Sequence, residues 1–221
     1  MLPRGRPARH ASADAAGDAS WTGQLPDNKR RGAFWLLALW TSVEALVVWG
    51  FNMQAVNVFM ALGLGQAAAI GAWMLSGPSQ ALIRTGELIS GSRYSIFAVG
   101  LISAVLAPIG LTIFLATGAT AGTAAMLAIL FGSGLGLYSI ARQVIPLRLF
   151  GIAEFGSISG RLTLPQNVAT AIAPLLFAAV LSHAGPLVAV ALALVFSCIA
   201  LCALIALIRL AQGSSGPTSD G

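Results

Sequence analysis

The chain has 221 residues, of which 57% are hydrophobic and only 9% charged, and its mean hydropathy is +0.86. Soluble domains carry about 25% charged residues, so this composition excludes a water-soluble globule and predicts a membrane protein. The net charge of +5 does not indicate nucleic-acid binding, because the basic residues are not interleaved with the aromatic residues of a binding platform.

Residues 1–32 are polar and hold six of the twelve Lys and Arg residues. They lack the continuous apolar stretch of a signal peptide. Positive residues beside a membrane span are typical of the cytoplasmic side. We therefore expect a flexible cytoplasmic segment at 1–32.

Six apolar segments follow, and each is long enough to be a helix that crosses a bilayer. We expect these helices at about 33–61, 66–84, 94–116, 123–149, 163–183 and 187–210. Loops are expected at 86–93 and 151–161, and shorter breaks at 62–65, 117–122 and 183–186. The Gly- and Ser-rich residues 211–221 are expected to form a disordered cytoplasmic tail.

The positions of the cations predict the orientation of these spans. With the N-terminus inside, all twelve Lys and Arg residues fall in the tails and in the regions 84–93 and 142–161, which are then cytoplasmic. The outside connections near residues 63, 119 and 184 hold none. Six spans with both termini cytoplasmic follow from this asymmetry.

Glu44 is the one charged residue between Gly32 and Ile83. It lies ten residues after Phe34, or roughly 15 Å of helix rise, which is near the middle of a hydrocarbon core about 30 Å thick. A charged carboxylate there costs about 3 kcal/mol on insertion scales. Glu44 therefore faces a wet cavity, pairs with a cation or stays protonated. One interpretation is proton or substrate handling, and the other is a protonated glutamate that hydrogen-bonds inside the bundle.

Three amide side chains, Asn52, Gln54 and Asn57, lie further along the same span. They do not share one helical face, since Asn52 and Gln54 lie on opposite sides of the direction of Glu44. The helix unwinds near Gly50, or only some of the three reach a cavity. Each is a candidate for the substrate or proton pathway, with hydrogen bonding between helices as the alternative.

Four charged residues lie near the predicted cytoplasmic ends of the spans. Arg84 with Glu87, and Arg142 with Glu154, are candidate pairs that would close the inner mouth of a pathway. The alternative for the arginines is that their side chains extend to lipid headgroups.

Glycines and prolines also occur inside the spans. The sequence from Gly132 to Gly136 has a glycine at every second position, which favours close approach of neighbouring helices. Five prolines are expected to kink their helices, as in transporters with broken helices beside a central site: Pro78, Pro108, Pro146, Pro165 and Pro174.

Four stretches of the chain form a recognisable set: RRGAFWLLALW (30–40), GPSQALIRTGE (77–87), GLGLYSIARQVIPLRLFG (134–151) and GRLTLPQNVATAIAPLLFA (160–178). Together they resemble the C-terminal six-helix half of a bacterial major facilitator superfamily transporter. The resemblance covers about 33–210. It implies an all-α membrane fold made of two inverted three-helix repeats, in the bacterial cytoplasmic (inner) membrane.

Members of that superfamily normally have twelve helices in two halves, and the transport pathway lies between the halves. A chain with six is a truncated product, a split half that awaits an N-terminal six-helix partner, or a half that pairs with a second copy of itself. The linker-like start of the chain favours truncation.

The function expected from these features is secondary transport of a small solute by alternating access, coupled to protons. A truncated, transport-inactive membrane protein is the alternative. An intramembrane enzyme is disfavoured, because Ser133 lacks a protease context and neither His10 nor His183 lies at membrane depth. We expect no cofactor and no metal centre, since His and Cys are few and scattered. Cys198 and Cys202 are expected to be small core residues.

Overall fold

The computed structural model of the chain describes residues 25–90 and 95–212. Residues 1–24 of the predicted segment 1–32 and residues 213–221 of the predicted tail 211–221 lie outside the described residues, as do residues 91–94 of the predicted loop at 86–93. Within the described ranges the fold is all-helical. The elements are α2 (Asp27–Leu46), the π-helix η2 (Val47–Phe51), α3 (Asn52–Ala61), α4 (Gln66–Met74), α5 (Ser76–Ser90), α6 (Ile96–Thr117), α7 (Ala121–Phe150), α8 (Ile152–Ala184) and α9 (Pro186–Gln212).

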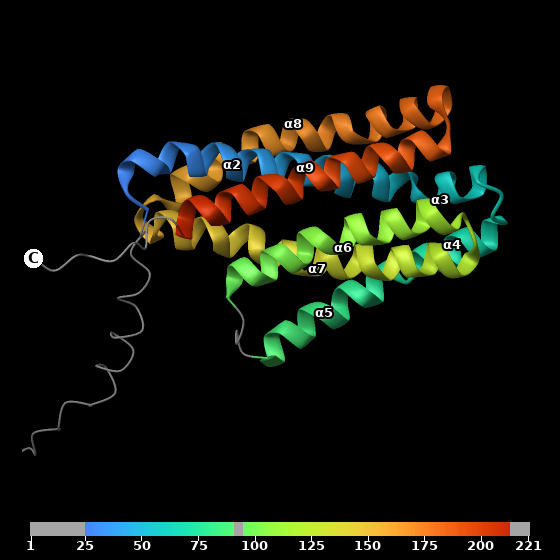
Figure 1. Cartoon of the computed structure of the whole chain (residues 1–221), viewed down its shortest axis with the longest axis horizontal. Coiled ribbons are helices and arrows are strands. Elements are labelled where there is room, and N and C mark those ends of the chain that lie inside the picture. Colours follow the sequence, from blue (N-terminus) through green and yellow to red (C-terminus); the bar gives the residue numbers. More distant parts are fainter. Residues whose placement is uncertain (1–24, 91–94, 213–221) are drawn as a thin grey trace, which may run out of the picture.

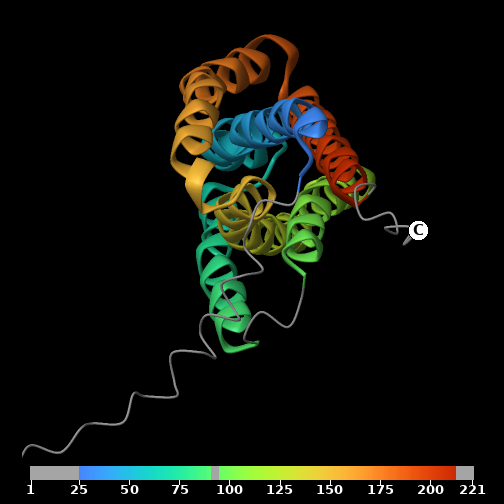
Figure 2. The same cartoon turned by 90° about the vertical axis from the view of Figure 1, so that its left-hand side faces the viewer.

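The long helices lie side by side along the long axis of the molecule (Figure 1). Helix α2 packs against α8 and α9, while α6 packs against α7 and α9. Helix α5 contacts α7 and extends away from the rest of the bundle, as the end view makes plain (Figure 2). The buried hydrophobic residues form two clusters, one around Phe51 and Phe131 and the other around Trp40 and Ile145.

Five helical stretches in the described part of the chain are long and apolar enough to cross a membrane. They are Asp27–Ala61, Ile96–Thr117, Ala121–Phe150, Ile152–Ala184 and Pro186–Gln212. The predicted second span at 66–84 is instead divided at Leu75 into α4 and α5. Pro78 explains the division, because its ring nitrogen cannot donate the hydrogen bond that would continue α4.

Three predicted boundaries were wrong, and in each case a helix covers residues expected to be irregular. Helix α2 begins at Asp27 rather than at 33, and α5 continues to Ser90 through the first part of the predicted loop at 86–93. The predicted loop at 151–161 is reduced to Gly151, after which α8 begins. Gly151 has a φ of 78°, a conformation that glycine adopts without strain, so the chain reverses at a single residue.

The glycine-rich stretch of α7 lies at close helix–helix contacts, as predicted. A Cβ added to Gly132 would collide with the backbone of Ser76, and one added to Gly136 would collide with Ile83, both on α5. A Cβ on Gly134 would lie 3.0 Å from the carbonyl oxygen of Ser103 on α6. Successive glycines therefore let α7 approach two different neighbours.

The charged ends of the helices gather at one end of the bundle. Lys29, Arg30 and Arg31 lie in the first turns of α2, Arg148 in the last turn of α7 and Arg209 in the last turn of α9. These three helix ends share one side of the molecule (Figure 1). The connections at 62–65, 118–120 and 185 lie at the opposite end and contain no Lys or Arg. This is the segregation that the sequence predicts, while the assignment of the cationic end to the cytoplasm stays a prediction.

Candidate functional site

Glu44 lies inside the bundle, between the two hydrophobic clusters. Only 7% of the surface of Glu44 is exposed. Along the chain, the cluster on one side includes Trp40 and the cluster on the other side begins at Val47. A buried carboxylate flanked by apolar clusters is a costly feature in a membrane protein, and residues of this kind commonly serve function.

The backbone that follows Glu44 departs from a regular α-helix near Gly50, although it does not unwind there. Residues Val47–Phe51 form a π-helix, so the chain is wound more widely around Gly50 but remains helical. A Cβ added to Gly50 would collide with the ring of Phe177 and lie 3.0 Å from the carbonyl oxygen of Ala173 on α8. Single π-helical turns inside α-helices are frequent at functional sites. Here the wide turn lets α8 approach the chain within two turns of Glu44.

Polar groups of α2 and α7 meet at this level of the bundle. The Tyr138 hydroxyl donates to the backbone carbonyl of Thr41, with 3.4 Å between the oxygens. The charges of Glu44 and of Arg142, which lies one turn further along α7, both act on this hydroxyl. Tyr138 therefore stands between an acid and a base. We call Thr41, Glu44, Tyr138 and Arg142 the polar cluster.

A pocket of about 150 Å³ adjoins the polar cluster between α2, α7 and α8. Thr41 and Arg142 line it, together with Gln143, Ser159, Thr163 and Gln166. Ligand pockets for small molecules are usually about 300–1,000 Å³, so this one has room for a few waters rather than for a typical ligand. Its hydroxyl and amide side chains suit water, and Pro146, Phe155 and Leu162 form the apolar part of its wall.

The three predicted amides lie apart from the polar cluster. Asn52 accepts a hydrogen bond from the Trp73 indole, with 2.9 Å between Nε1 and Oδ1, and so joins α3 to α4. Asn57 donates to Gln54 one turn away, at 2.9 Å. For Asn52 the interhelix hydrogen bond, weighed as the alternative to cavity lining, is the arrangement observed.

The two proposed gate pairs are not formed. No ion pair joins Arg84 to Glu87, or Arg142 to Glu154, among the residues that the structure describes. Glu154 instead accepts from Arg30, with 2.6 Å between Oε1 and Nη1, and this contact ties the start of α2 to the start of α8. Because α8 begins at Ile152, Glu154 lies in its first turn at the end of the bundle, whereas Arg142 lies two turns inside α7.

Sequence reasoning missed Thr41, Tyr138 and Arg30. The spacing of Thr41 to Glu44, and of Tyr138 to Arg142, puts each pair on one helical face, and this signal could have found both. Cys198 and Cys202 were expected in the core, but both are free and exposed on α9. Within residues 25–90 and 95–212, no three His, Cys, Asp or Glu side chains come together in a way that could hold a metal ion.

The sequence matches no protein-family model, and no curated protein matches it either.

Proposed function

We propose that this protein is a membrane transporter, or one half of a transporter, in which Glu44 carries a proton while a small solute crosses the membrane. The observation that supports it most is the buried Glu44, which interacts electrostatically with Tyr138, together with a pocket lined by Thr41 and Arg142 between α2, α7 and α8.

The chemistry of the polar cluster fits two states. When Glu44 is charged, Arg142 is the cation of the polar cluster that offsets it, since both charges act on the Tyr138 hydroxyl. When Glu44 is protonated, that attraction is lost and α2 is less tightly held to α7. Loading and release of a proton thus change the interaction between two helices, which is what a coupled conformational change requires.

The proposal extends to the wider architecture. In the superfamily that the sequence resembles, a pathway lies between two six-helix bundles, each made of two inverted three-helix repeats. We propose that α4 and α5 together form the sixth membrane-crossing unit and that a second bundle completes the pathway, either an N-terminal half or another copy of this chain. The proposed location is a bacterial inner membrane with the cationic end in the cytoplasm.

Solute-driven proton movement in vesicles tests the function. The purified chain is reconstituted into liposomes that contain a pH-sensitive dye, and sugars, amino acids, organic acids and lipophilic cations are added in turn. At least one class should move protons in the wild type. Glu44→Gln should abolish that movement, whereas Asp27→Asn, a change at an exposed residue in the first turn of α2, should preserve it.

Two results would contradict the proposal. Proton movement that is unchanged in Glu44→Gln would remove Glu44 from the mechanism. A folded, monodisperse wild type that moves no proton with any solute class would favour the transport-inactive membrane protein instead.

A further inference from the structure

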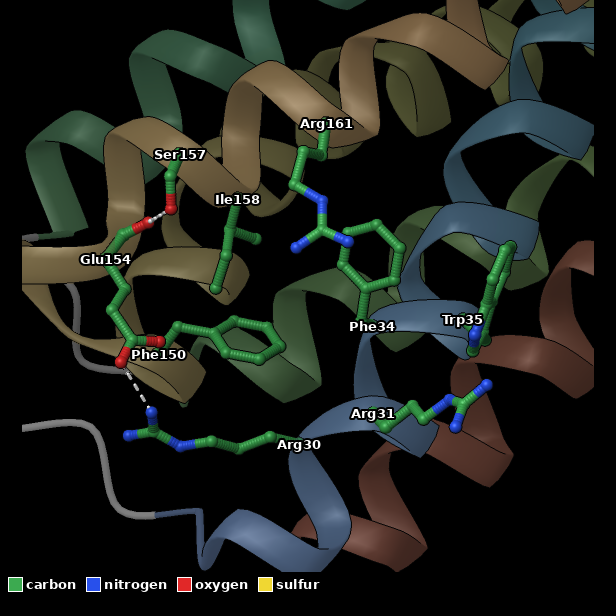
Figure 3. Close-up of a pocket in the computed structure, with 9 residues that line it drawn as sticks. All are labelled: Arg30, Arg31, Phe34, Trp35, Phe150, Glu154, Ser157, Ile158 and Arg161. Atoms are coloured by element: carbon green, nitrogen blue, oxygen red, sulfur yellow. Dashed lines mark hydrogen bonds and ion pairs between the residues drawn. The ribbon is translucent and has the colours of Figure 1, made fainter.

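A second pocket, larger and more strongly charged, lies where α2, α7 and α8 meet at the cationic end of the bundle. Its volume is about 460 Å³. Three arginines line it, Arg30 and Arg31 from α2 and Arg161 from α8, together with the single carboxylate Glu154 (Figure 3). It shares no lining residue with the smaller pocket beside the polar cluster.

The three arginines are not equivalent. Arg30 is held by Glu154 at 2.6 Å, by Asp27 at 3.4 Å and by the backbone carbonyl of Leu25 at 3.2 Å, so its charge is already balanced. No ion pair joins Arg31 or Arg161 to a carboxylate of the described part of the chain. The pocket therefore has two guanidinium groups in excess.

Arg161 is held in place by an aromatic ring rather than by an acid. Its guanidinium carbon lies 5.2 Å from the centre of the Phe34 ring (Figure 3). Such a cation–π contact orients the guanidinium without neutralising it. The N–H groups at the edge of the guanidinium plane stay available to an acceptor, and a phosphate is the acceptor that the planar fork of arginine matches best.

The position of the pocket identifies the kind of molecule that can reach it. Arg31 lies in the first turns of α2, just before the apolar part of the helix, and the neighbouring Trp35 is 62% exposed. Exposed tryptophans at the ends of membrane helices lie at the level of the lipid headgroups. A basic pocket between helices at this depth is open to anionic headgroups from the side.

We propose that this pocket binds a phosphate-bearing anion, through Arg31 and Arg161, and that the anion is the headgroup of an anionic phospholipid. Phe34 and Trp35 provide the apolar wall for the glycerol and upper acyl region, while Arg30 and Glu154 hold the two helices that frame the pocket. The inference needs the bundle to lie in a membrane but does not depend on transport or on Glu44.

Competition between lipids in native mass spectrometry tests the site. The detergent-purified, delipidated chain is mixed with equal amounts of phosphatidylglycerol and phosphatidylcholine that have the same acyl chains. The wild type should retain phosphatidylglycerol preferentially. Arg31→Gln with Arg161→Gln should lower that preference about tenfold, since each interfacial arginine contributes on the order of a several-fold factor.

Two further variants sharpen the test. Arg209→Gln removes an exposed cation from the same end of the bundle, outside the pocket, and should leave the preference unchanged. Arg31→Lys with Arg161→Lys keeps the charge but loses the planar fork, so this variant should show only part of the wild-type preference. If the double variant aggregates, Arg161→Gln is measured alone, and it should lower the preference for phosphatidylglycerol about threefold.

A parallel arm with inorganic phosphate separates the two sources of the anion. If millimolar phosphate leaves the bound phosphatidylglycerol in place, the headgroup assignment is supported. If phosphate binds in an arginine-dependent way and displaces the lipid, the pocket is a phosphate site, but its ligand is a soluble anion and the headgroup assignment is wrong. An equal loss of preference in Arg209→Gln, or no preference in the wild type, would overturn the site.

Discussion

At the scale of single residues, Glu44 has two interpretations that differ in what they predict for stability. If Glu44 is a proton carrier, it lowers the stability of the bundle, because a buried acid in an apolar bundle is less stable than a hydrocarbon side chain. As a structural residue it would stabilise the bundle through its hydrogen bonds. Thermal unfolding can therefore distinguish the two without knowledge of the solute.

We expect Glu44→Leu to fold and to be as stable as the wild type, or more stable by up to about 3 kcal/mol. The reason is that leucine removes a buried carboxylate flanked by the clusters around Trp40 and Val47. Unfolding in detergent, followed by size-exclusion chromatography after heating, measures the change. A clear fall in the unfolding temperature would instead favour the structural interpretation.

The candidate site could be predicted from the sequence only in part. Glu44 stands out because it is a lone charge in a long apolar stretch, which a reader of the sequence can see directly. Its neighbour Tyr138 lies 94 residues away, and no periodicity within one helix predicts which helices meet. For the same reason Glu154 was matched to Arg142 by closeness in sequence, whereas the fold pairs Glu154 with Arg30.

At the scale of helices, the glycines of α7 set the distance to α5. Helix α5 extends away from the bundle (Figure 2), so its contact with α7 at Gly132 and Gly136 is a main attachment. Without a Cβ on either glycine, the α7 backbone lies directly against Ser76 and Ile83. A side chain there would push the two helices apart.

Gly132→Ala should therefore destabilise the protein by about 1–3 kcal/mol, the usual cost of overpacking a close contact. The clash is with backbone atoms of α5, which cannot rotate away. Gly71→Ala is the matched control: it lies inside α4, a Cβ there meets nothing within 4 Å, and the higher helix propensity of alanine should make it neutral or stabilising. Chemical or thermal unfolding of both variants measures the difference, and equal stability of the two would contradict the close contact.

The helices themselves were more predictable than their ends. Apolar length marked the long helices, because a bilayer requires about 20 apolar residues from each. The length of an apolar stretch could not show that α2 begins at Asp27 or α8 at Ile152. The first turns of both helices contain charged residues, so they do not belong to the apolar stretch. The division of the second span at Leu75 depends on Pro78, and a proline inside an apolar stretch can either kink a helix or end it.

At the scale of the whole molecule, one end of the bundle carries the cations and the other end carries short connections without them. The same asymmetry places the pocket lined by Arg30, Arg31 and Arg161 near the first turns of α2 and α8, while the polar cluster lies deeper in the bundle. Both proposed sites therefore depend on a bilayer that separates the two ends. The membrane orientation is the premise that they share.

Cysteine accessibility in intact cells and in inverted membrane vesicles tests that premise most directly. In a background with Cys198→Ser and Cys202→Ser, single cysteines replace four exposed residues: Asn28 and Gln212 at the cationic end, and Ala121 and Ala184 at the other. A membrane-impermeant maleimide should label positions 121 and 184 only from outside the cell, and positions 28 and 212 only in inverted vesicles. Labelling of all four positions from the same side would contradict a bundle that spans the membrane with its cations on one face.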